Sequence, residues 1–233
     1  MDDLSVVFFD YGDTLAYWAV SGAALWREVL NDLEQVDVPL EEIQAARMRV
    51  DDELRDQIYA YHGSLERYRD EQGRRTLRHL GFSREHTGWL VPQVIRGLEE
   101  RRRHAVHLFP EVREVLRTLS ERGYRLAMIS NALEDLLHAL DDLELRVLFQ
   151  SVTYSQEVGS EKPDPKIFRL ALQRMDCLPG QAAHVGNDYG ADVVGARSVG
   201  IFPVLIDRHD YHPEVDCLRI RDLRELLPHL PGP

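Results

Sequence analysis

The chain has 233 residues, of which 28 are Lys or Arg and 40 are Asp or Glu, so its formal net charge at pH 7 is −12. This acidic balance argues against a nucleic acid or an anionic membrane as partner, because either would repel the protein surface. The two cysteines, Cys177 and Cys217, lack the spacing of a disulfide framework or zinc site, and no apolar run is long enough to cross a bilayer. We therefore expect a cytoplasmic protein.

Five short apolar segments, rich in β-branched and aromatic residues, alternate with segments of helical periodicity. They are residues 5–9, 124–130, 151–154, 182–186 and 201–206. Short continuous apolar runs are typical of strands that are buried on both faces of a parallel sheet. Strands that alternate with helices are joined by right-handed crossovers. The fold class that we expect is therefore α/β, with a doubly wound parallel sheet.

Residues 16–104 show no convincing strand pattern and are predicted to form an all-helical insert. The sheet domain would then consist of residues 1–15 and 105–233. Within the insert, Pro92 interrupts the last helical pattern, which predicts a kink or a boundary at that point. The insert also offers aromatic and histidine side chains as candidates for lining a substrate pocket, namely Tyr17, Trp18, Trp26, Tyr59, Tyr61 and His62.

Polar residues cluster after the predicted strands, where open parallel sheets bind their ligands. The clusters are Asp10, Gly12, Asp13 and Thr14 after the first strand, Ser130 and Asn131 after the second, Lys162 in the loop after the third, and Asn187, Asp188 and Asp192 after the fourth. Some of these residues also have a purely structural interpretation. Asp10 and Asp13 could close a turn. Asn131, with Glu134 three residues later, matches a helix capping box. Asp164, which precedes a proline, predicts the start of a helix.

Taken together, the clusters match the requirements of phosphoryl transfer. A carboxylate such as Asp10 can attack phosphorus and form an acyl phosphate. Mg²⁺, which takes hard oxygen ligands, would offset the repulsion between the attacking anion and the phosphate. Ser130 and the N–H groups of the following helix can receive phosphate oxygens. Lys162 would supply a fixed positive charge.

Four segments, FFDYGDTL, MISN, GSEKPDPKIF and HVGNDYGADVVGA, resemble in order and spacing the four motifs of the haloacid dehalogenase-like superfamily. The resemblance covers roughly residues 4–15 and 105–207. It implies a Rossmann-like core, a helical C1 cap that closes over the substrate, and a phosphatase-like activity. It also implies that Asp10 is the nucleophile and that Gly12, Ser130, Asn131 and Lys162 surround the phosphate. The metal would be bound by Asp10, the Gly12 carbonyl and Asn187 or Asp188, and Asp192 would orient the lysine or outer-shell waters.

Two positions depart from the pattern of that superfamily. Its phosphatases usually carry an acid/base aspartate two residues after the nucleophile, whereas this chain has Gly12 there and Asp13 next to it. Protonation of the leaving group is then open to Asp13, a cap residue or water. The metal-binding aspartate usually follows the glycine of the fourth motif directly, whereas here Asn187 stands at that place and Asp188 follows. An amide oxygen can still coordinate Mg²⁺, although with less charge.

Three functions remain compatible with these residues. The first is a Mg²⁺-dependent phosphatase of a small phosphorylated metabolite, acting as a monomer or homodimer. The second is a metal-free 2-haloacid dehalogenase, and the third is a catalytically weak phosphate-binding protein of the same fold. Charge favours the first, because Asp10, Asp13, Asp188 and Asp192 beside Lys162 sum to about −3 without a metal. A divalent cation would bring this sum to about −1 and favour an ionised nucleophile.

Overall fold

The chain folds into two compact units. The computed structural model describes residues 4–54 and 65–233, so the candidate pocket residues Tyr59, Tyr61 and His62 lie outside the described residues. One unit consists of Met1–Tyr17 and Leu108–Pro233, and the other consists of Trp18–His107.

The first unit contains a parallel sheet. In its described residues the sheet has six strands in the order β5-β4-β1-β6-β7-β8, and each neighbouring pair is parallel. The strands are β1 (Val6–Phe9), β4 (Arg125–Ser130), β5 (Ser151–Tyr154), β6 (Ala182–Gly186), β7 (Phe202–Ile206) and β8 (Leu218–Ile220). The predicted α/β fold with a doubly wound parallel sheet is therefore confirmed. The sequence pattern missed β8, because this strand has only three residues and one of them is Arg219.

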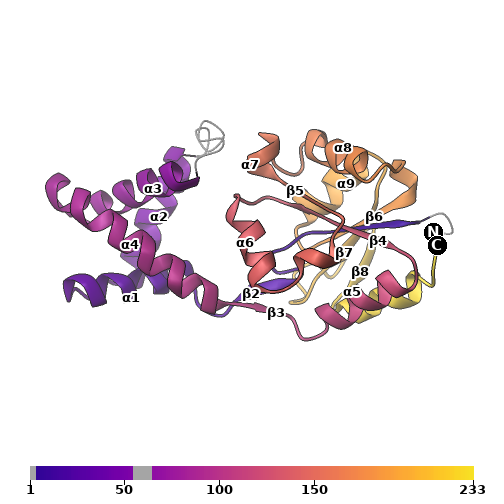
Figure 1. Ribbon diagram of the computed structural model, residues 1–233, viewed down its shortest axis with the longest axis horizontal. Helices are drawn as coiled ribbons and strands as arrows, with labels where there is room; N and C mark the ends of the chain where they lie inside the picture. The colour runs from indigo at the N-terminus through magenta and orange to yellow at the C-terminus, as the bar shows by residue number, and fades with distance from the viewer. Residues whose placement is uncertain (1–3, 55–64) are drawn as a thin grey trace. The chain divides into compact units, whose positions relative to one another are not determined.

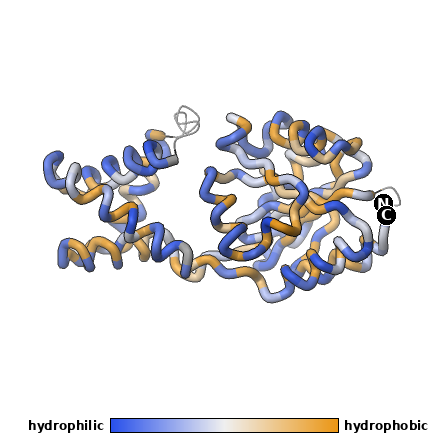
Figure 2. The backbone as a smooth tube through the Cα atoms, viewed as in Figure 1, coloured by the Kyte–Doolittle hydropathy of each residue, from blue (hydrophilic) through white to orange (hydrophobic). Residues whose placement is uncertain are grey.

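Helices cover both faces of this sheet, with α5 and η5 on one face and α7, α8 and α9 on the other (Figure 1). The helices of the unit are α5 (Val112–Glu121), α6 (Asp135–Asp142), η2 (Arg146–Leu148), α7 (Ser155–Val158), α8 (Pro165–Arg174), η3 (Pro179–Gln181), η4 (Tyr189–Val194), α9 (Gly195–Ser198) and η5 (Leu223–His229). Because both faces are covered, the central strands are nearly continuous apolar segments (Figure 2).

The core between β1 and α8 follows from the two periodicities of strand and helix. Val6 and Phe8, two residues apart on β1, pack in one cluster with Ile167 and Phe168 of α8. The start of α8 is fixed by Asp164, whose side chain accepts the N–H of Lys166 at 2.8 Å. The predicted helix start at Asp164 is thus confirmed, and the helix that follows the Lys162 loop has a defined first turn.

A small two-stranded sheet links the two units. It pairs β2 (Ala16–Trp18) with β3 (Val106–Leu108), and the division between the units falls inside both strands. The predicted boundaries, after residue 15 and before residue 105, fall just outside this sheet. The prediction that residues 16–18 belong to an all-helical insert is wrong, because a strand of three residues is too short to show a periodic pattern.

The second unit is a helical bundle in its described part. Its helices are α1 (Gly22–Glu34), α2 (Leu40–Leu54), α3 (Leu65–His79) and α4 (Arg84–Ala105). Trp26 is only 4% exposed and packs in the apolar core of this bundle, whereas Trp18 is 46% exposed. Of these two candidate pocket residues, Trp26 therefore acts in packing. None of the helices in residues 4–54 and 65–233 is long and apolar enough to span a bilayer.

The helix α4 runs through Pro92, so the predicted boundary at that residue is wrong. Proline removes one backbone N–H donor and disfavours a helix interior. Here Leu90, Val91 and Val94, close to the proline on the same helix, are completely buried in the bundle core. Tertiary packing of this apolar face outweighs the local cost of the proline.

Beyond β7, a buried carboxylate organises the segment that leads to β8. Asp207 accepts the backbone N–H groups of Tyr211 and His212 and the Nε of Arg219, each at 2.9 Å. Burial raises the pKa of Asp207, but these donors outweigh burial and lower the pKa to about 2. The ionised form therefore stabilises the fold.

We expect Asp207→Asn to lower the free energy of unfolding by about 1–2 kcal/mol at pH 7. Since the folded pKa lies below the unfolded value, the stabilisation is present above pH 4 and is lost as the pH falls towards 2. Urea unfolding at pH 7, 5 and 3 should thus show a difference between the two proteins that shrinks with acidity. The control Asp210→Asn removes a carboxylate that is 58% exposed and should cost less than about 1 kcal/mol. A loss for Asp207→Asn that does not vary with pH would contradict this account.

Candidate active site

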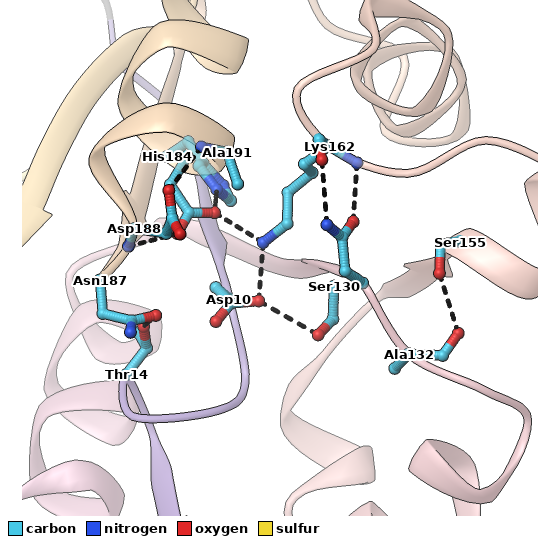
Figure 3. A network of polar contacts seen from close by, with 12 residues as sticks. Asp10, Thr14, Ser130, Ala132, Ser155, Lys162, His184, Asn187, Asp188 and Ala191 are labelled. Carbon is cyan, nitrogen blue, oxygen red and sulfur yellow. Dashed lines mark hydrogen bonds and ion pairs between the residues drawn. The ribbon is translucent and has the colours of Figure 1, made fainter. Parts of the chain in front are cut away.

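Three neighbouring strands bring the predicted residues to one edge of the sheet. Because β4, β1 and β6 are adjacent and parallel, their carboxyl ends lie at the same edge. Asp10 follows β1, and its backbone N–H donates to the carbonyl of Val185 in β6 at 2.9 Å. Ser130 is the last residue of β4, and Lys162 reaches the same place from the loop before α8 (Figure 3).

The centre of the site is the carboxylate of Asp10. Its Oδ1 accepts the Ser130 hydroxyl at 3.1 Å and the Lys162 ammonium at 2.7 Å. Asp10 is 6% exposed, and Ser130 and Lys162 are each 4% exposed. Figure 3 shows the second oxygen of Asp10 turned away from both donors, on the side where Asn187 and Thr14 lie. The predicted nucleophile, hydroxyl and ammonium therefore form one connected group.

A second buried carboxylate, that of Asp192, completes this group. Lys162 Nζ donates to Asp192 Oδ1 at 2.6 Å, and His184 Nε2 contacts the same oxygen at 2.9 Å. The backbone N–H of Asp188 donates to Asp192 Oδ2 at 3.0 Å. Gly186 makes room for this carboxyl group, since a Cβ at that position would lie 2.1 Å from Asp192 Cγ. Asp192 thus touches the lysine directly.

Burial and the charges of this group together shift the pKa values of its members in different directions. Burial raises the pKa of Asp10, and although Lys162 lowers it in part, it stays above its ordinary value. For Lys162, the two carboxylates outweigh burial and raise the pKa. For Asp192, burial raises the pKa, but Lys162 and the hydrogen bond with His184 outweigh it and bring the pKa well below its ordinary value. At neutral pH the lysine is therefore protonated and Asp192 ionised.

The side chain of Asn131 bonds to the loop that carries Lys162 and does not cap the helix α6. Its side-chain Nδ2 donates to the Lys162 carbonyl at 3.0 Å, and its Oδ1 accepts the Lys162 N–H at 2.7 Å. The helix α6 instead begins at Asp135, where Glu134 makes no side-chain capping bond. The capping interpretation of Asn131 is wrong, because the amide pairs with a backbone 31 residues away. Asn131 anchors the loop that carries the lysine.

The loop after β1 carries Asp13 and Thr14. Asp13 is exposed, has a left-handed backbone with φ 54°, and donates its N–H to the Ala16 carbonyl at 2.7 Å. Thr14 is buried and donates its hydroxyl to Asn187 Oδ1 at 3.4 Å, which ties this loop to the end of β6.

The candidate metal ligands are all oxygen donors. Asp188 is exposed, and its Oδ1 accepts the Ala191 N–H at 2.7 Å as the first residue before η4. Among the residues that the structure describes, no group of three His, Cys, Asp or Glu side chains gathers as a metal site. A divalent cation here would therefore depend on the carboxylate of Asp10, the Gly12 carbonyl and an oxygen of Asn187 or Asp188. Such hard oxygen donors suit Mg²⁺.

Two residues near the site did not emerge from the sequence. His184 lies within an otherwise apolar strand, and that isolated imidazole was the available signal. Arg208 donates to the Thr14 carbonyl at 2.8 Å, and its guanidinium lies 3.5 Å above the Phe109 ring. Arg208 thereby ties the loop after β1 to the segment after β3. In the sequence, nothing distinguishes this arginine from one on the protein surface, so the contact could not be predicted.

A parallel sheet that gathers a carboxylate, a hydroxyl and an ammonium at its carboxyl ends defines a Rossmann-like protein with a carboxylate-centred active site. Residues 4–200 match the haloacid dehalogenase-like hydrolases, and the chain belongs to this family. The resemblance seen in the four motifs is thus confirmed.

Relatives of the chain include phosphatases. A phosphoserine phosphatase from Thermus thermophilus is 37% identical over 164 residues, which are 69% of this chain and 64% of that protein. A glyceraldehyde 3-phosphate phosphatase from Methanothermobacter thermautotrophicus is 38% identical over 100 residues, 42% of this chain and 44% of that protein. The chain therefore matches less than two thirds of the length of either relative.

Similar solved structures cover nearly the whole chain. A 2-haloacid dehalogenase from Pseudomonas syringae pv. Tomato DC3000 superposes with a TM-score of 0.73 at 26% identity, over 97% of each chain. A HAD phosphatase from Thermococcus onnurineus superposes with a TM-score of 0.66 at 22% identity, over 98% of this chain and 99% of the other. The second likeness shows the fold alone.

We expect Asn131→Ala to lower the free energy of unfolding by about 1–2 kcal/mol, because two hydrogen bonds to the Lys162 backbone are lost. Asn131→Asp keeps an acceptor for the Lys162 N–H and should lose less. Urea unfolding of the three proteins at pH 7 measures both values. If the alanine variant were as stable as the unsubstituted protein, the anchoring role of Asn131 would be wrong.

Proposed function

We propose that the protein is a Mg²⁺-dependent phosphatase of a small phosphorylated metabolite and that Asp10 is its nucleophile. The observation that carries this proposal is the buried carboxylate of Asp10, with one oxygen held by Lys162 and Ser130 and the other turned away from them. The phosphatases among its relatives support the same chemistry.

In the proposed reaction, a carboxylate oxygen of Asp10 forms a bond to phosphorus while the bond from phosphorus to the leaving oxygen breaks. The leaving oxygen takes up a proton. Water then attacks phosphorus, breaks the bond to Asp10 and releases inorganic phosphate. The hydroxyl of Ser130 and the ammonium of Lys162 hold the phosphate oxygens and the nucleophile in line, in a buried site where such charges act strongly.

The residues at this edge fit a divalent cation. Asp10, the Gly12 carbonyl and Asn187 or Asp188 would hold it, and all of these donors are oxygens. When bound, the ion lowers the repulsion between the carboxylate and the phosphate. The raised pKa of Asp10 agrees with a site that needs added positive charge, because burial and Asp192 both disfavour its ionised form.

Protonation of the leaving group is assigned to Asp13 or to water. Gly12 cannot supply a proton, and Asp13 is the next residue on the same loop. Its side chain is exposed. The absence of an acid at Gly12 implies a modest rate for substrates with poor leaving groups, since a placed acid contributes about 10²–10⁴-fold.

The second unit is proposed to be a cap that selects the substrate. Its helices form a bundle with a core of its own, which suits a module that moves as one body. Two relatives are named as phosphatases of phosphoserine and of glyceraldehyde 3-phosphate, both small phosphate monoesters. We propose that the protein acts on a compound of this class in the cytoplasm, as a monomer or homodimer.

We expect Asp10→Asn to abolish turnover while the fold is kept, because an amide of equal size is a far weaker nucleophile. Phosphate release measures the rate, and urea unfolding checks that the variant is folded. The matched control Asp141→Asn changes an exposed carboxylate on α6 and should leave the rate unchanged. A rate for Asp10→Asn equal to that of the unsubstituted protein would remove the proposal.

The cation and the reaction class can be tested together by a screen of small phosphate monoesters with Mg²⁺ and with EDTA, alongside a 2-haloacid. We expect phosphate release with Mg²⁺ and at least about a 100-fold loss with EDTA, since the buried carboxylates lose the offsetting charge. Halide release without metal would instead favour the dehalogenase function that the structure from Pseudomonas syringae suggests. If neither phosphate nor halide is released under any of these conditions, the result would favour a phosphate-binding protein.

We expect Gly12→Asp to raise kcat about 10-fold or more on alkyl phosphates, whose leaving groups need a proton. Gly12 is not among the described residues with positive φ, so its backbone accepts an aspartate. On p-nitrophenyl phosphate, whose leaving group needs no proton, the rate should change little. An unchanged rate on alkyl phosphates would mean that Asp13 or water already supplies the proton.

A further inference from the structure

His184 is a buried polar residue to which the proposed reaction gives no role. It lies in the middle of β6 and is 0% exposed. Its ring meets the ring of Phe168 edge to face, with centroids 5.4 Å apart. Its Nε2 lies 2.9 Å from Asp192 Oδ1, the same oxygen that receives Lys162 (Figure 3). An imidazole in such a strand needs a reason, because burial of a polar ring is costly without a partner.

The contacts of His184 define which nitrogen carries the proton. Oδ1 of Asp192 already accepts the Lys162 ammonium, so in its contact with His184 this oxygen is again the acceptor and Nε2 is the donor. The other nitrogen, Nδ1, is buried and has no hydrogen-bond partner among the described residues. The hydrogen bond to Asp192 therefore uses Nε2 as its donor, and Nδ1 takes no part in it.

The donor from His184 fixes the carboxylate of Asp192 in one orientation. Oδ1 receives His184 and Lys162, and Oδ2 receives the backbone N–H of Asp188. Three donors therefore hold the carboxyl group, two on Oδ1 and one on Oδ2. Because Lys162 Nζ lies 2.6 Å from Asp192 and 2.7 Å from Asp10, any rotation of Asp192 would move the ammonium relative to the nucleophile.

The strand geometry explains why this donor sits at position 184. Residues two apart on a strand point to the same face, so His184 and Gly186 share one face of β6. The glycine leaves space for the Asp192 carboxyl group, which a Cβ would meet at 2.1 Å. Phe168 closes the other side of the imidazole. The ring is thus confined by packing with its Nε2 aimed at the carboxylate.

We propose that His184 is a positioning residue of the active site: its Nε2–H fixes Asp192, and through Asp192 it holds the Lys162 ammonium against Asp10. It does not touch the reacting atoms. The catalytic part of this inference rests on the proposed phosphatase function, whereas the geometric part does not.

Two variants separate the hydrogen bond from the packing. His184→Gln keeps a side-chain N–H in reach of Asp192, and His184→Leu fills similar volume without a donor. We expect the leucine variant to lose about 10- to 100-fold in kcat with KM changed less than about 3-fold, because the nucleophile and lysine are misaligned after substrate has bound. The glutamine variant should recover to within about 3-fold of the unsubstituted kcat. Equal losses in both variants at equal stability, checked by urea unfolding, would overturn the proposal.

A measurement without substrate keeps the outcome independent of the phosphatase function. Nitrogen-15 NMR of the unsubstituted protein should show a proton on Nε2 of His184. The ammonium signal of Lys162, visible because the group is buried, should shift in His184→Leu and stay in place in His184→Gln. An imidazole without a proton on Nε2, or an unmoved lysine signal in the leucine variant, would overturn the proposal. If the screen detects no phosphate release, the proposed function fails and the NMR result alone decides the role of His184.

Discussion

The structure depends on one buried ion-pair arrangement, the ammonium of Lys162 held between the carboxylates of Asp10 and Asp192. Each of these groups alone would be costly in an interior, and together they are tolerated because each charge has a partner within hydrogen-bond distance. One positive and two negative charges still leave a net negative group. The carboxylate of Asp10, with its raised pKa, bears this imbalance.

The sheet supplies the rigidity that this arrangement needs. The strands β1, β4 and β6 are apolar and covered on both faces, so their ends cannot shift without disturbing the core. Short polar links then join the loops that follow them. Asn131 anchors the Lys162 loop, and Thr14 ties the loop after β1 to Asn187. The strands of the sheet therefore fix the geometry of the site, whereas the loops that follow them carry most of its polar residues.

The departures from the family pattern fall on the side of the leaving group and the cation. Lys162, Ser130 and Asp10 occupy their expected places in one network, whereas Gly12 and Asn187 replace acidic residues by neutral ones. The binding and attack machinery is complete under the proposed function, while the proton supply is reduced. A relative of the chain is named as a phosphatase and a similar solved structure as a dehalogenase, so the fold alone does not decide the chemistry.

The sequence by itself determined the fold class and the residues that form the centre of the site. The fold class could be predicted because strand burial and helix periodicity are local patterns. Since polar residues after parallel strands meet at one edge of the sheet, Asp10, Ser130 and Lys162 could be grouped from the sequence alone. Only the tertiary structure decided which groups form hydrogen bonds with one another. Asn131 matches a capping pattern locally but bonds a loop 31 residues away, and His184 reads as one polar residue in an apolar strand. Hydrogen-bond partners depend on register and packing between distant segments, which no local pattern contains.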